Sequence, residues 1–121
     1  MRFDSASQVT TDKGHPSVFE GVIARVWRGW TEPADADEYE AFVTETVFPD
    51  AKRDIPALES FEVLRRDAGD EVEFVTIARF ASWDAIEAFA GEDYETAHVL
   101  DRAEELLARY EETVAHYEVL A

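Results

Sequence analysis

The chain has 121 residues, of which 46% are hydrophobic and 12% aromatic, a composition typical of one folded domain. It carries 28 acidic against 11 basic residues, a net charge of −17, which excludes nucleic acid and anionic membrane as expected partners. It has no cysteine, which excludes disulfides, thiolate metal ligands and a cysteine nucleophile and fits a cytoplasmic location. An acidic, lysine-poor chain is typical either of a highly soluble surface or of a high-salt habitat, and the composition leaves both open.

Residues 1–17 are polar and lack the apolar run of a signal peptide, so they are predicted to be a flexible leader before a domain over residues 18–121. Residues 21–30 are rich in β-formers and predict the first strand. A helix is expected to begin at Thr31-Glu32-Pro33, with Asp35 and Glu38 at capping-box spacing. Pro49 should end or kink this helix, which leaves residues 50–56 as a connection.

Residues 58–66 and 71–81 predict two strands joined by a hairpin turn that contains Gly69. Ser82 is a favourable N-cap for a short helix that Gly91 closes. A second helical stripe runs from Leu100 to Tyr110, and residues 113–120 alternate as a fourth strand. The order β-α-β-β-α-β predicts a ferredoxin-like α+β fold with a four-stranded antiparallel sheet.

Both faces of this sheet have apolar residues at their centres. The third strand alternates Phe74 and Ala78 with Val75 and Ile77. Two helices can cover only one face, and an uncovered face is normally polar. The pattern therefore predicts that the second face packs against another copy, as a homodimer.

Three stretches carry a family resemblance: IARVWRGWT, the long block FEVLRRDAGDEVEFVTIARFASWDAIEAFAGEDYETA, and TVAHYEVL. With them, the segment from Val22 to Ala121 resembles the antibiotic biosynthesis monooxygenase family of the dimeric α+β barrel superfamily. The resemblance implies a barrel-like dimer with a cavity between the sheet and the helices of each subunit. Members of the family include cofactor-free oxygenases of polycyclic phenols and haem-degrading enzymes.

Two histidines are candidate site residues. His98 ends the stretch Tyr94-Glu95-Thr96-Ala97-His98, which is similar in place to the F-K-A-A-H pattern of the haem-degrading members. It is either a general base or ligand facing the cavity, or a surface or capping histidine. His116 is either a proton shuttle or a histidine hydrogen-bonded within the sheet or dimer interface.

Aromatic and basic side chains complete the candidate set. Trp27, Phe80 and Trp83 either form the aromatic wall of a pocket or belong to the core. Arg25 and Arg79 lie among apolar strand residues, where each either pairs with an acidic neighbour such as Glu73 or Glu118 or anchors an anionic or phenolic ligand group.

The leading hypothesis is a small cytoplasmic monooxygenase that oxidises an aromatic or phenolic compound with molecular oxygen and no cofactor, with His98 as its base. The sequence has no metal-binding motif, and we expect no metal site. The alternatives are a non-catalytic dimer that binds a small hydrophobic ligand, and haem binding or degradation through His98. Haem-degrading members also use an Asn on the first strand, near Trp27 or Arg28 here, and this chain contains no Asn, which favours the non-catalytic alternative.

Overall fold

The computed structural model describes residues 19–121, and the predicted leader over residues 1–17 lies outside this part of the chain. No helix in the described part combines the length and apolarity that crossing a bilayer requires. In chain order, the elements are β1 (Ile23–Thr31), the 3-10 helix η1 (Pro33–Asp35), α1 (Ala36–Phe42), the π-helical segment η2 (Val43–Val47), α2 (Phe48–Asp54), β2 (Leu58–Ala68), β3 (Glu71–Phe80), α3 (Trp83–Ala90), α4 (Asp101–Leu106), β4 (Leu107–Tyr110) and β5 (Ala115–Glu118).

The sheet is antiparallel, with strands in the order β2-β3-β1-β4, and β5 also pairs with β1. β4 pairs with residues 29–31 and β5 with residues 23–26, so these two short strands follow one another along the same edge of β1. The predicted ferredoxin-like α+β fold is confirmed. The sheet has five strands rather than four because its last edge is divided between β4 and β5.

The prediction of one helix from Leu100 to Tyr110 is wrong beyond Leu106. The backbone becomes extended at Leu107, and the residues that follow pair with the edge of β1 instead of continuing the helix. Gly29 permits the close approach, because a Cβ at that position would lie 2.9 Å from Leu107 Cδ2. Backbone pairing with an open strand edge therefore overrides the helical spacing of the apolar residues.

The helix does not end at Pro49, which was one of the two outcomes predicted for this proline. α1, η2 and α2 form one continuous rod through residue 54, so the residues predicted as a connection are mostly helical. The rod takes up the proline through its π-helical segment, in which the Phe48 N–H donates to the Val43 carbonyl five residues back. A wider turn relieves the clash that a proline ring makes with the preceding turn of an α-helix.

The predicted turns and caps are mostly confirmed. Gly69 (φ 78°) lies in the turn between β2 and β3, and Gly91 (φ 81°) ends α3, both in a conformation that favours glycine. The Ser82 hydroxyl accepts a hydrogen bond from the Ala85 N–H at 3.1 Å, as an N-cap does. Asp35 caps α1 by position only, because its side chain makes no capping hydrogen bond.

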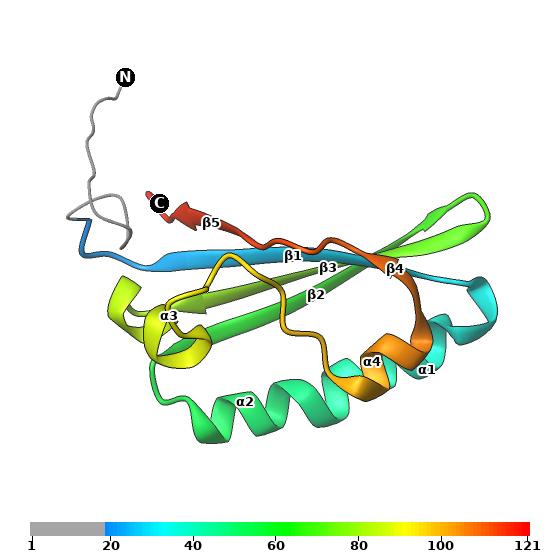
Figure 1. Ribbon diagram of the computed structural model, residues 1–121, viewed down its shortest axis with the longest axis horizontal. Helices are drawn as coiled ribbons and strands as arrows, with labels where there is room; N and C mark the ends of the chain where they lie inside the picture. The colour runs from blue at the N-terminus through cyan, green and yellow to red at the C-terminus, as the bar shows by residue number, and fades with distance from the viewer. Residues whose placement is uncertain (1–18) are drawn as a thin grey trace.

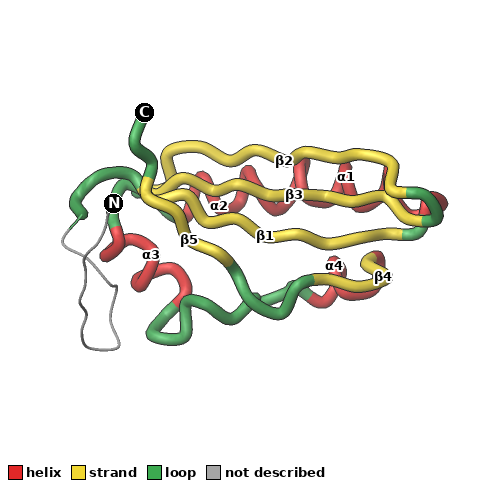
Figure 2. Tube along the Cα trace, turned by 90° about the horizontal axis from the view of Figure 1, so that it is seen from above, coloured by secondary structure: helices red, strands yellow, loops and turns green. Residues whose placement is uncertain are grey.

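The α-helices of the described residues lie on one side of the sheet, as Figure 1 shows, and in Figure 2 the strands lie in front of α1 and α2. Two groups of buried side chains fill the space between the layers. One surrounds Tyr39 and Phe74 toward the β4 end of the sheet, and the other surrounds Phe80 and Trp83 toward the β5 end. The region between these two groups positions the candidate site.

The other side of the sheet carries no described helix (Figures 1 and 2). Alternation along β1 and β3 places Val26, Val75 and Ile77 there, and β2 adds Leu64, which is 48% exposed. Tyr117 of β5, paired with Ala24, is 57% exposed. This apolar face agrees with the pattern that led us to expect a homodimer, which stays a prediction.

Candidate functional site

A cavity of about 660 Å³ lies between the sheet and the helices. β1 and β3 supply its floor, the rod from α1 to α2 supplies one wall, and α3, α4 and the loop between them supply the other. Its volume is in the range of pockets that hold small organic molecules. Its lining includes the apolar side chains Trp27, Tyr39, Phe42, Val43, Leu58, Phe61, Ala78, Phe80, Phe89, Val99 and Val114.

The exposed lining residues mark the mouth of the cavity. Thr46, Asp50 and Asp54 are four residues apart and share one side of the helical rod. Phe89 and His98 come from α3 and the loop after it. One side of the mouth is therefore acidic, and the other combines an aromatic ring with an imidazole.

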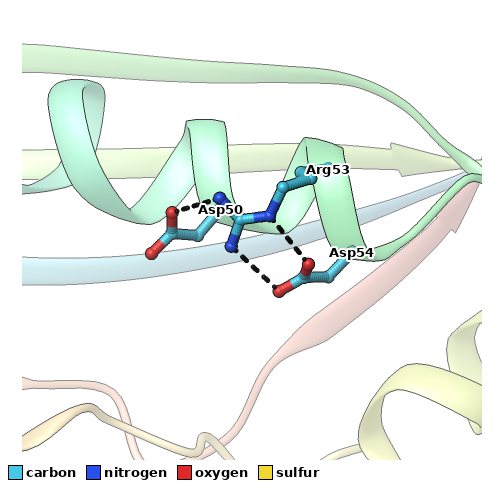
Figure 3. Close-up of polar contacts among 3 residues, drawn as sticks. All are labelled: Asp50, Arg53 and Asp54. Carbon is cyan, nitrogen blue, oxygen red and sulfur yellow. Dashed lines mark hydrogen bonds and ion pairs between the residues drawn. The ribbon is translucent and has the colours of Figure 1, made fainter.

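Arg53 bridges the two aspartates of the mouth, as Figure 3 shows. Its Nη1 lies 3.2 Å from Asp50 Oδ1, and its Nε lies 3.1 Å from Asp54 Oδ1. All three side chains are exposed, so these ion pairs add little stability. The trio keeps a net negative charge at the mouth, which favours the entry of neutral molecules over anions.

Arg25 introduces a positive charge into the mostly apolar lining. Its Nη1 donates to the Tyr94 carbonyl at 2.6 Å and to His116 Nε2 at 2.9 Å, and its guanidinium lies 5.6 Å from the centre of the Phe89 ring. Within residues 19–121 no carboxylate lies within 4 Å of it, so the expected ion pair with Glu73 or Glu118 is not formed. Burial lowers the pKa of Arg25 to about 10, which still leaves it charged at neutral pH.

Two hydrogen bonds use both N–H groups of Nη1 and leave three donors, on Nε and Nη2, with no hydrogen-bond partner in the described part of the chain. A partly desolvated cation without a counter-ion is costly, and an anionic ligand atom would offset that cost. Arg25 is therefore the residue of this cavity best suited to hold a negative charge.

His116, on β5, is a hydrogen-bond partner of Arg25. Because arginine can only donate, Nε2 of His116 must accept, so the ring is neutral with its proton on Nδ1. Burial and the charge of Arg25 lower the pKa of His116 to about 4. The ring also packs against Trp83 and Tyr94, each with centroids 5.4 Å away. His116 thus contacts the anchor and is not among the residues that line the cavity.

Of the three predicted aromatic residues, Trp27 and Phe80 line the cavity, and Trp83 does not. Trp27 is fixed by its indole N–H, which donates to the Glu111 carbonyl at 2.6 Å. Trp83 is buried and packs against Tyr94 and His116. It therefore contacts the histidine that accepts a hydrogen bond from Arg25.

Arg79 lies on the other face of the sheet, where its Nη1 donates to Glu62 at 2.8 Å. The structure therefore places it away from the cavity that we expected it to line. Alternation in the strand explains the difference, because Arg79 falls one residue from the inward-facing Ala78 and Phe80.

His98 is exposed and lines the cavity near its mouth. The N-cap of α4 is Leu100, so His98 is not a helix cap. Its loop is held by two backbone hydrogen bonds, from the Ala97 N–H to the Glu112 carbonyl and from the Val114 N–H to the Glu95 carbonyl. The imidazole thus lies on a fixed loop, between bulk water and the cavity.

Tyr39 and Thr76 also line the cavity, and sequence reasoning did not select them. Tyr39 lies in the apolar stripe of its helix, and such a stripe does not show which members border an empty space. Thr76 lies at the centre of β3, where alternation gave the face but not the gap above it.

No family model matches the sequence, and no curated protein matches it at a significant level. Two solved structures share its fold. A provisionally assigned antibiotic biosynthesis monooxygenase from Caulobacter crescentus CB15 is 20% identical, with a TM-score of 0.62 over 85% of this chain and 93% of that one. Rv0793 from Mycobacterium tuberculosis is 19% identical, with a TM-score of 0.56 over 84% and 97% of the two chains. The resemblance to the antibiotic biosynthesis monooxygenases is thereby supported at the level of the fold.

The lining fits haem poorly. Trp27 stands near the place where the resemblance implied an Asn in haem-degrading members of the family, and its N–H already donates to a backbone carbonyl. The region therefore presents a bulky aromatic side chain with no free donor.

Proposed function

We propose that the protein binds a neutral aromatic phenol in this cavity and oxidises it with molecular oxygen, without a metal or flavin. The observation that supports this most is Arg25, which lines a largely apolar cavity with three unbonded N–H groups. The aromatic lining suits a flat ring, and the negative mouth favours substrates that arrive uncharged.

Arg25 would hold the phenol oxygen and favour its ionised form. An unperturbed phenol has a pKa of about 10, and a cation within hydrogen-bond distance lowers this value. His98, at the mouth, would accept the proton and pass it to water. The neutral ring of His116 would keep the guanidinium oriented.

The phenolate is the reductant in this proposal. Ionisation places negative charge on a ring carbon, and that carbon forms a bond to molecular oxygen. The O–O bond and the C–H bond of that carbon then break, and one oxygen atom stays on the ring as a quinone carbonyl. The other takes up the ring proton and a proton from solvent, which replaces the one given up by the phenol, and leaves as water. A phenol and one O₂ thus give a quinone and one H₂O, with all four electrons supplied by the substrate.

Oxygen uptake on a panel of polycyclic phenols tests the reaction. We expect consumption of one O₂ per phenol without added reductant, one ¹⁸O atom from ¹⁸O₂ in the quinone, and at least tenfold slower turnover in His98→Ala. Unchanged turnover in His98→Ala would remove the base assignment. Tight binding of these phenols with no oxygen uptake would identify a non-catalytic binding protein instead.

A homodimer is part of the same proposal. Val26, Val75, Ile77 and the exposed Leu64 form an apolar face that no described helix covers. Light scattering should give twice the chain mass for the wild type and a monomer mass for Ile77→Glu, which places a charge at the centre of this face. A monomeric wild type at micromolar concentration would refute the assembly.

A further inference from the structure

Tyr39 is the most enclosed polar residue of the cavity lining. It is 2% exposed and packs edge-on against Phe74, with ring centroids 4.8 Å apart. It belongs to α1, so it reaches the cavity from the helical wall, above the sheet that carries Arg25. Nothing in the proposed reaction uses it.

The Tyr39 hydroxyl has no hydrogen-bond partner in the described part of the chain. It is also not among the fully enclosed side-chain atoms that lack a partner, a group that includes Thr31 Oγ1. The hydroxyl therefore keeps a small accessible surface, and it belongs to a residue that lines the cavity. Burial alone raises its pKa to about 12, so it stays protonated and able to donate at neutral pH.

Tyr39, on the helical wall, and Arg25, on the floor, lie toward opposite ends of the cavity. Tyr39 packs on Phe74, whereas Arg25 pairs with Ala78, four residues further along β3. Four residues of a strand span roughly 13 Å. Between them lies the apolar stretch that contains Trp27 and Thr76.

We propose that the Tyr39 hydroxyl is a specificity determinant, which donates a hydrogen bond to an acceptor oxygen, such as a ketone, at the end of the ligand opposite the phenol. The inference rests on the proposed function, because Arg25 then takes the phenol oxygen. The preferred ligand is an elongated aromatic compound with an acidic hydroxyl at one end and a carbonyl at the other. A ligand without the carbonyl leaves a buried donor unsatisfied, so selectivity comes from that penalty.

Two probes of nearly equal shape test this step: 6-acetyl-2-naphthol, and 6-isopropenyl-2-naphthol, in which a CH₂ group replaces the ketone oxygen. We expect calorimetry to show that the wild type prefers the acetyl compound about tenfold. Tyr39→Phe should bring the ratio to about one and leave the affinity for the isopropenyl compound unchanged. Tyr110→Phe is the matched control, because its hydroxyl donates to Glu104 on the surface and should not affect the ratio.

The unliganded variants give a second readout. Removing a hydroxyl without a protein partner should leave the melting temperature of Tyr39→Phe unchanged or higher. A fall of more than about 4 °C would show that the hydroxyl bonds to the protein, and would overturn the inference.

The two proposals fail differently. Equal preference for the acetyl probe in the wild type and Tyr39→Phe would overturn the role of Tyr39 and leave the phenol site intact. No binding of either probe to the wild type would overturn the phenol site and the role of Tyr39 together.

Discussion

The neutral state of His116 has a consequence for stability that can be measured directly. Its pKa falls from an ordinary value of 6.5 to about 4 in the folded protein. As pH drops from 6.5 to 4, His116 therefore becomes protonated in the unfolded chain but stays neutral in the folded chain. The free energy of unfolding must fall across this window, and the full contribution is present only above pH 6.5.

The magnitude follows from the size of the pKa difference. At about 1.4 kcal/mol per pKa unit, the difference between 6.5 and about 4 gives an upper bound of about 3.4 kcal/mol. Because the ring is only partly buried, solvent screening reduces the expected loss to about 2 kcal/mol. Below pH 4 the folded ring also binds a proton and repels Arg25, which loosens the anchor.

His116→Phe isolates this effect, because it keeps a ring against Trp83 and Tyr94 and removes the titrating nitrogen. Urea unfolding from pH 8 to 4 should show the wild type losing about 2 kcal/mol more than the variant, since the carboxylates common to both cancel in the difference. His98→Ala is the control variant, because it removes a different histidine, the one at the mouth of the cavity. Parallel curves for the wild type and His116→Phe, or an NMR titration of His116 near 6.5, would refute the reasoning.

Two further predictions concern the scaffold. Ser82→Ala should lower the free energy of unfolding by about 1 kcal/mol in urea, because it removes the cap on the Ala85 N–H; no change would show that the helix does not depend on it. The melting temperature should rise between low and molar NaCl, because a net charge of −17 repels itself and salt screens this repulsion; a flat or falling curve would remove the high-salt interpretation.

Much of the fold followed from local chemistry. The strands, the hairpin at Gly69 and the caps at Ser82 and Gly91 depend on neighbours in the sequence, and the structure has them. The misses at Pro49 and beyond Leu106 are of another kind. One depends on a π-helical turn and the other on pairing with the edge of β1, and apolar spacing reveals neither.

The site was harder to predict than the fold. Alternation put Phe80 and Arg79 on opposite faces of the sheet, but which face the helices cover and the gap bordered by Tyr39 depend on how the layers pack. Arg25 is the most instructive residue. An acidic chain offers many partners, yet this guanidinium bonds to a carbonyl and a neutral imidazole, which no count of charges could indicate.

The most direct test of the central claim is calorimetric binding of 2-naphthol to the wild type, Arg25→Met and Arg28→Met. Arg28 is exposed on the same strand and is not part of the lining, so it controls for loss of a positive charge. The account predicts binding to the wild type and Arg28→Met, and at least tenfold weaker binding to Arg25→Met, the cost of losing a charge-assisted hydrogen bond. Equal affinity in all three proteins would show that Arg25 does not anchor the ligand and would contradict the account.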